Sequence, residues 1–433
     1  MLFIIVGFLI LFLCVLKPFK FSLLFIIYYL LFISPVDSYA IFELIRKGSD
    51  LVYAGSVALL FCSYIIFCFY FINNRKIFNA PIRNFIFFIN LLIFIIFFNT
   101  FLKNFDLLYS ISVTMSTGLP FCLIIPFVYF SNKALNSFIA LIAIKIFLSI
   151  SVIYNPDLLF FINGAFYQKE LGLFVLDAKS NSLSGSLTLD KALVGSYGIF
   201  HNPNSLGFHS VLLVSCSLFL IFIKNNLAKI LGFLFLFLSI LGWLNSLTRG
   251  PLVLLLISIV FLYIIKNKKS YIKINFALIS LIFVTMCFWL AFSDSLISYL
   301  IPSSDNISVT GRLAGYKDGL EAFLDNPILG IDNTNPKWEN LHVPHLFFLF
   351  YAYQFGFLPA LIVFFLIFGL FFKILIKVIS LKYLDNIKFL SIMWLFVLLG
   401  IALTNNFTSP FIFWSLFTLI LLMVYQDKDK LNV

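Results

Sequence analysis

The side chains best suited to chemistry are two arginines that stand at the borders of apolar segments. Arg249 lies in the tight turn SLTRGPL, where Pro251 opens the next apolar run, and Arg312 lies in the first turn of a helix-like segment, GRLAGYKDGLEAFLDN. A cation beside the positive end of a helix dipole is unfavourable alone, but it becomes favourable when both hold an anion such as phosphate. We therefore predict that Arg249 and Arg312 bind phosphate. The alternatives are a snorkelling Arg249 and an ion pair between Arg312 and a loop acid.

A histidine supplies the matching base. His345 follows Pro344 and opens a long uncharged run, residues 345–372. Because the positive end of a helix disfavours imidazolium, a neutral His345 can accept a proton from a hydroxyl, as a general base must. The alternative is an interfacial histidine that makes one backbone hydrogen bond, which we favour for the neighbouring His342.

A second polar stretch, GIFHNPNSLGFHS, precedes another apolar run. His201, Asn202 and Asn204 can hydrogen-bond sugar hydroxyls, although Asn-Pro-Asn is equally a plain turn before a helix. His209 lies one to two turns deeper and is expected to be buried rather than catalytic. Lys145, inside an apolar run, could reach a pyrophosphate or pair with polar groups between helices.

The composition indicates what positions these residues. Hydrophobic residues make up 62% of the 433 and charged residues 11%, whereas soluble domains average about 25% charged. Uncharged runs of membrane-spanning length recur along the chain. We therefore expect an all-α polytopic helical bundle of 12–13 transmembrane helices in a lipid bilayer. The net charge of +11 then reports topology, not a nucleic-acid partner.

The apolar runs divide the chain. They cover residues 2–16, 19–34, 51–72, 85–101, 107–130, 134–153, 205–223, 227–247, 251–265, 272–292, 345–372, 389–404 and 409–425. The first run is short, so it is either a full span or half of a hairpin with the second. One integral membrane unit results: an N-terminal bundle (1–153), a periplasmic loop (154–204), transmembrane helices (205–292), a large periplasmic loop with an amphipathic interfacial helix (293–344), and C-terminal transmembrane helices (345–433).

The charges orient these spans. Lysine and arginine concentrate in alternate loops, such as those holding Lys17, Arg75 and Lys133, and most acids lie in the others. The basic loops are therefore predicted to be cytoplasmic, with the C-terminus, and the two long loops and His345 lie at the outer face. The N-terminus stays open between the two alternatives. No polar-loop cysteine pair and no metal-ligand spacing occurs, so we expect neither disulfides nor a metal.

Four motifs, taken in order, resemble the O-antigen ligase and O-antigen polymerase superfamily of bacterial envelope proteins. HNPNSLG is similar to its Asn-Pro-Asn motif, and SLTRGPL to its Ser-Arg-Gly turn. GRLAGYKDGLEAFLDNPILGI resembles its arginine helix with a Pro-x-x-Gly turn, and HLFFLFYAYQFGFLP its histidine-led span, here with His345 and Gly356. The resemblance covers about residues 195–372.

The resemblance implies a function. It implies glycosyl transfer, without metal or cofactor, from a glycan on undecaprenyl pyrophosphate at the periplasmic face of the bacterial inner membrane. Arg249 and Arg312 would stabilise the leaving pyrophosphate, with Lys145 near it. His345 would activate the acceptor hydroxyl, and His201, Asn202 and Asn204 would bind sugar. A chain-length regulator and a flippase of the same pathway are the implied partners.

Three readings stay open. The ligase pattern has a polar residue after the histidine and Gly, Thr or Tyr three residues after the glycine; here these positions are Leu346 and Pro359. This favours an O-antigen polymerase, with a ligase that transfers polymer to lipid A–core as the alternative. The third reading is a lipid-linked oligosaccharide flippase or polysaccharide exporter. The lack of carboxylates near the middle of any span weighs against an ion-coupled transporter.

Overall fold

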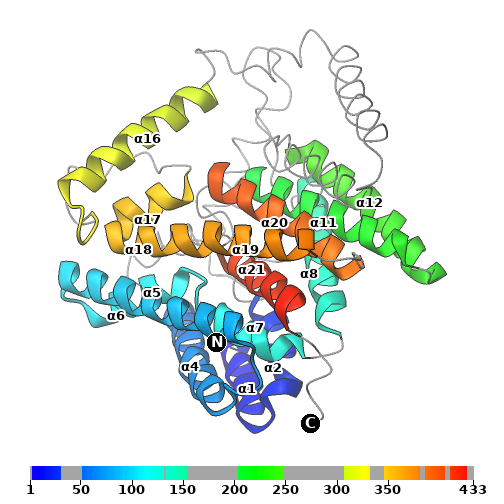
Figure 1. Ribbon diagram of the computed structural model, residues 1–433, viewed down its shortest axis with the longest axis horizontal. Coiled ribbons are helices and arrows are strands. Elements are labelled where there is room, and N and C mark those ends of the chain that lie inside the picture. Colours follow the sequence, from blue (N-terminus) through cyan, green and yellow to red (C-terminus); the bar gives the residue numbers. More distant parts are fainter. Residues whose placement is uncertain are drawn as a thin grey trace.

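The structure is a computed structural model that describes residues 2–30, 51–130, 133–154, 203–223, 225–246, 307–331, 346–380, 386–404 and 410–426. Every regular element in these ranges is a helix (Figure 1). The helices are α1 (Leu2–Leu16), α2 (Pro18–Tyr28), α4 (Leu51–Asn73), α5 (Ala80–Asn104), α6 (Leu107–Ser116), α7 (Phe121–Tyr129), α8 (Ala134–Tyr154), α11 (Pro203–Phe222), α12 (Asn226–Ser246), α16 (Ile307–Asp325), α17 (Phe347–Phe355), α18 (Phe357–Phe364), the π-helix η3 (Phe365–Gly369), α19 (Leu370–Ser380), α20 (Asn386–Thr404) and α21 (Pro410–Tyr425).

Several of these helices could cross a membrane. By length and composition five candidates stand among the described residues: α5, α8, α11, α12 and the run Phe357–Lys377. The pair α6 and α7, bent by 44°, would make a sixth, and α1, α2, α4, α20 and α21 are apolar but shorter over their fully described residues. The all-helical fold with several membrane-length helices is confirmed. The total of 12–13 spans and the two long outer loops extend outside the described residues and stay predictions.

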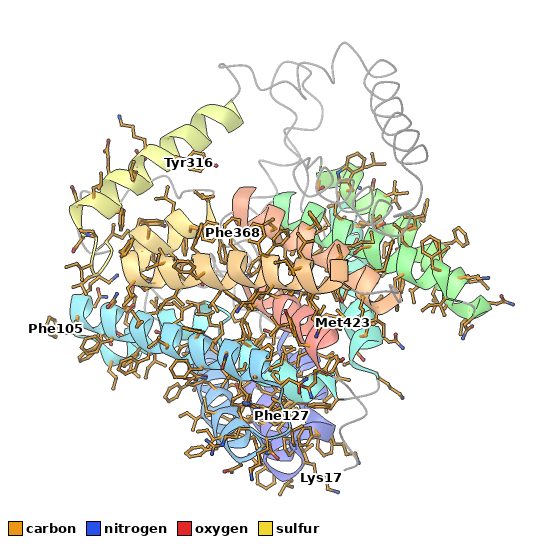
Figure 2. The ribbon with its side chains drawn as sticks, in the orientation of Figure 1. Lys17, Phe105, Phe127, Tyr316, Phe368 and Met423 are labelled. Atoms are coloured by element: carbon orange, nitrogen blue, oxygen red, sulfur yellow. The ribbon has the colours of Figure 1, made fainter. Side chains whose placement is uncertain are left out.

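The first two helices form an antiparallel hairpin about Lys17. Gly7 in α1 and Tyr28 in α2 lie about equally far from Lys17 along the chain, one on each side of it. A Cβ on Gly7 would nevertheless lie only 3.1 Å from the Tyr28 ring, so α2 runs back along α1. Lys17 lies at one extremity of the bundle (Figure 2). Two full spans and two halves of a hairpin would both pack in this antiparallel way, so both alternatives for the first apolar run stay open.

Three chain segments meet at one end of α5. The backbone N–H of Asn79 donates to Oε1 of Gln426 (3.1 Å), and Nε2 of Gln426 donates to the carbonyl of Ile77 (3.0 Å). The Tyr129 hydroxyl donates to the Gln426 carbonyl (3.2 Å). The loops that hold Arg75 and Lys133 and the end of α21 therefore lie together, as the charge pattern predicts for loops of one face. The cytoplasmic assignment of that face stays a prediction.

Phenylalanine serves two purposes in this bundle. Phe127 is fully buried, and its ring contacts Phe19, Phe67 and Phe78 at centroid distances of 5.2 to 5.7 Å. Others, such as Phe94 at 63% exposure, lie on the outside of the bundle. Phenylalanine therefore both packs the interior of the bundle and covers its outer surface.

Candidate functional site

The apolar run after His345 is a helical hairpin. The ring of Phe348 in α17 lies 5.4 Å from that of Phe364 and 5.3 Å from that of Phe368. In one continuous helix these residues would stand about 24 and 30 Å away along the axis. Gly356, with φ of 90°, reverses the chain, so α17 runs back along α18. The single helix expected over 345–372 is wrong in this respect.

The fold-back changes where the histidine-led helix begins. The membrane-length run starts at Phe357, and Phe368 lies at its middle (Figure 2). The start of α17 lies beside that middle, where Phe347 is 2% exposed and packs on Phe413 of α21 at 4.9 Å. The helix that follows His345 thus begins among buried side chains of the bundle, and the expected place of His345 at the outer membrane boundary stays a prediction. His345 itself lies outside the described residues.

Three helix N-termini meet at this point. The rings of Phe121, at the start of α7, and Phe411, at the start of α21, lie 5.3 Å apart. Phe347, at the start of α17, packs on the first turn of α21. We call the starts of these three helices the helix-end junction. Broken helices in membrane bundles present their N-terminal ends to charged substrate groups. In α7 the N–H groups of Phe121, Cys122 and Leu123 already donate to carbonyls of the preceding turn, at 3.0 to 3.2 Å, so this helix end contributes its dipole and not free N–H donors.

The turn after α16 docks on the tip of the hairpin. α16 ends at Asp325, directly before Asn326 and Pro327, a proline position at which helices commonly end. The N–H of Ile331 donates to the carbonyl of Tyr353, and the N–H of Phe357 donates to that of Pro327, both at 2.7 Å. A Cβ on Gly356 would lie 2.0 Å from the Ile328 oxygen, so the turn approaches the tip as closely as only glycine permits.

Two side chains of α5 complete this contact. Lys103 donates from Nζ to the carbonyls of Gln354 (2.8 Å) and Ile331 (3.1 Å). Asn99 donates from Nδ2 to the carbonyl of Phe355 (2.7 Å) and lies 3.4 Å from that of Ile328. Sequence reasoning missed both residues. Their only signal is that Asn99 and Lys103 stand four residues apart, on one face at the end of an apolar helix.

The helix that carries Arg312 is present. α16 packs against α17, as Figure 1 also shows. Its small residues Gly319 and Ala322 are buried, whereas Leu320 is 49% exposed. On the solvent side, Lys317 and Glu321 form an exposed pair at 3.9 Å. The helix is therefore confirmed, but it begins at Ile307, so Arg312 is its sixth residue and lies in the second turn. The expected place of Arg312 in the first turn, beside the helix N-terminus, is wrong, because the helix extends further towards the N-terminus than the sequence suggested. The place of α16 in a membrane interface stays a prediction.

A buried polar cluster joins α8, α11 and α12. The Lys145 side chain is 4% exposed and interacts electrostatically with His209, which is fully buried. Nδ1 of His209 lies 2.7 Å from the Ser205 carbonyl. A Cβ on Gly242 of α12 would lie 2.5 Å from the Ser210 hydroxyl, so the three helices touch at this level. His209 is thus buried, as expected.

The remaining predicted site residues fall in two groups. The backbones of Arg312 and Asn204 belong to α16 and α11, but their side chains lie outside the described residues, as do Arg249, His201, Asn202 and His342 in full. The structure brings Lys145 and His209 together and places α16 against α17. Among the described residues, no group of three His, Cys, Asp or Glu side chains could hold a metal ion.

Comparison with known families assigns this part of the chain. Residues 234–365 match the family model of O-antigen ligases. The predicted resemblance is confirmed. The O-antigen-ligase-type segment runs from the middle of α12 to the start of η3 and contains Arg249, Arg312 and His345. No curated protein matches the chain.

Proposed function

We propose that this protein is a membrane glycosyltransferase that polymerises a surface polysaccharide. It transfers a glycan from undecaprenyl pyrophosphate, at the periplasmic face, to the hydroxyl of a new lipid-linked repeat unit. The observation that carries the proposal is the O-antigen-ligase-type segment at residues 234–365, which contains both arginines and His345. The same segment holds the hairpin that brings the start of α17 into the bundle.

The proposed chemistry follows from charge. A leaving pyrophosphate develops negative charge, and stabilising that charge is usually the largest catalytic contribution. The guanidinium groups of Arg249 and Arg312 would provide this stabilisation through paired N–H donors. His345 would take the proton of the acceptor hydroxyl. Sugar would be bound by His201, Asn202 and Asn204. The buried Lys145 would add positive charge near the pyrophosphate.

The helix-end junction supports an anionic substrate. α7 and α21 run side by side from their starts to the contact between Tyr129 and Gln426. α17 runs the opposite way, because its other end contacts Asn99 near the far end of α5. Positive helix ends that face one another repel, and a bound anion relieves that repulsion.

A ligase is the second candidate, because the matching family model describes O-antigen ligases. Leu346 is the N-cap of α17 and makes no side-chain hydrogen bond there. A polar residue at this position, as in the ligase pattern, would cap the helix beside the histidine. The apolar cap favours the polymerase.

Site variants test the proposal. We expect Arg249→Ala, Arg312→Ala and His345→Ala each to abolish long surface polysaccharide on a gel while the protein still inserts. Lys317→Ala, on the exposed side of the same helix as Arg312, and His342→Ala are the matched controls and should leave chain length normal. Normal chain lengths in the three site variants would overturn the proposed site.

A deletion strain separates the candidate activities. Loss of a polymerase leaves single repeat units on the surface. Loss of a ligase strands polymer on its lipid carrier, and loss of a flippase or exporter removes all surface repeat units. Either of the last two results would overturn the polymerase assignment.

A further inference from the structure

The strongest unassigned polar contact in the described structure is the one between α5 and the hairpin tip. We call Asn99, Lys103 and the four carbonyls that they contact, those of Ile328, Ile331, Gln354 and Phe355, the tip lock. Two of these carbonyls belong to the last turn of α17, where no helical N–H is available to them. The other two belong to the turn that follows α16.

The lock joins parts of the chain that are far apart in sequence. Its hydrogen bonds link residues 228 to 256 positions apart. Asn99 and Gln354 are 8% and 7% exposed, so the contact is largely shielded from water. Leaving a buried carbonyl without a donor is unfavourable, so the two side chains hold the tip in a defined arrangement.

The tip lock lies at the C-terminal ends of α16, which carries Arg312, and of α17, which follows His345. Arg312 precedes the end of α16 by 13 residues, about 20 Å along the helix. His345 stands two residues before α17, whose nine residues cover about 13 Å. A tilt of about 10° at the tip would move a group about 20 Å away by roughly 3 Å. Misplacement by about 1 Å can cost a 10²-fold loss of rate.

We propose that Lys103 and Asn99 are positioning residues for glycosyl transfer: they fix the hairpin tip and the turn after α16, and thereby the relative placement of the helices that lead to His345 and Arg312. The inference rests on the proposed function. A lysine that merely snorkels would keep its ammonium in water. The Lys103 ammonium instead donates to two carbonyls from two different segments.

Kinetics with purified protein and undecaprenyl-pyrophosphate-linked repeat units provide the first test. For Lys103→Met and Asn99→Leu we expect kcat per folded protein to fall about 10- to 100-fold, with KM changed less than about threefold. Lys103→Arg retains a cation and donors and should recover most of the rate. Asn104→Leu is the matched control, because Asn104 donates only within α5, to the carbonyl of Thr100 (2.9 Å), and its kcat should stay unchanged.

A distance measurement tests the placement independently of activity. Nitroxide labels at Leu320→Cys and Phe365→Cys, on exposed faces of α16 and η3, report the relation between the two segments in a background with the six native cysteines replaced. We expect a narrow distance distribution with Lys103 and Asn99 present and a broad one in the double variant Lys103→Met/Asn99→Leu.

The outcomes separate this inference from the proposed function. An unchanged distance distribution in the double variant, or an unchanged kcat per folded protein, overturns the positioning role. If His345→Ala and Arg312→Ala are inactive while Lys103→Met is fully active, only the inference fails. If those two site variants retain activity, the proposed function fails as well, and the distance measurement still decides whether the lock holds the helices.

Discussion

Replacing Gly356 by alanine should disrupt the hairpin of α17 and α18. Gly356 has φ of 90° and ψ of 177°, a conformation that residues with a side chain rarely adopt. The added Cβ would lie 2.0 Å from the oxygen and 2.6 Å from the carbon of the Ile328 carbonyl. Both contacts are to backbone, so neither can be relieved by a side-chain rotation.

The expected magnitude follows from these contacts. Holding alanine in a sparsely populated backbone region costs about 1–3 kcal/mol. Moving the turn away lengthens the hydrogen bond from Phe357 to Pro327 and separates Asn99 from the Ile328 carbonyl. Each lost hydrogen bond costs a further amount of about 0.5–1.5 kcal/mol. We expect Gly356→Ala to lower the free energy of unfolding by about 3 kcal/mol.

Gly369→Ala is the matched control. Gly369 lies on the same membrane-length run, and a Cβ there would meet nothing within 4 Å. Unfolding of both variants in detergent, followed by tryptophan fluorescence against denaturant, compares them directly. Equal stability of Gly356→Ala and Gly369→Ala would refute the proposed close packing of turn and tip.

Three further predictions concern other parts of the molecule. Arg249→Lys and Arg312→Lys should shorten surface polysaccharide nearly as much as alanine does, because lysine cannot form a paired guanidinium contact with phosphate; full chain length on a gel would indicate that plain charge suffices. Gly242→Leu should lower the free energy of unfolding by about 1–3 kcal/mol, because the leucine side chain would separate α12 from Ser210 and Ile146. Gly242→Ala should be milder, because the atom nearest to the added Cβ belongs to a rotatable hydroxyl. Equal melting curves for Gly242→Leu and the parent protein would contradict this prediction. Gln426→Leu should cost about 1–3 kcal/mol by leaving the Ile77 carbonyl and the Asn79 N–H without this partner, and a denaturation midpoint equal to that of the parent protein would argue against the joined ends.

The sequence predicts the helices well and their breaks poorly. Apolar length alone identifies the runs that become α5, α8, α11 and α12, because the hydrocarbon core requires that length. The reversal at Gly356 lies within an equally apolar run, where Gly356 and Pro359, three residues further on, give only a weak local signal of a break. Its conformation depends on Ile328 and on Asn99, which are distant in sequence.

For the candidate site, too, the sequence identifies individual residues but not the contacts between them. Residue chemistry selects Arg249, Arg312 and His345, and the family match covers all three. Residue chemistry also identifies Lys145 and His209 separately, but only the packing of α8 against α11 reveals that the two side chains interact. Asn99 and Lys103 could not be selected, because polar residues near the end of a span are ordinary there and their partners are backbone carbonyls, which every sequence contains.

The O-antigen-ligase-type segment does not stand alone in the structure. The donors to its turn and hairpin tip come from α5, and the ring that covers the start of α17 comes from α21; both helices lie outside residues 234–365. Removing either helix would leave buried carbonyls without donors or expose Phe347. The geometry of the segment therefore depends on the whole bundle, and we expect a change at Asn99 or Lys103 to affect the chemistry proposed for Arg312 and His345.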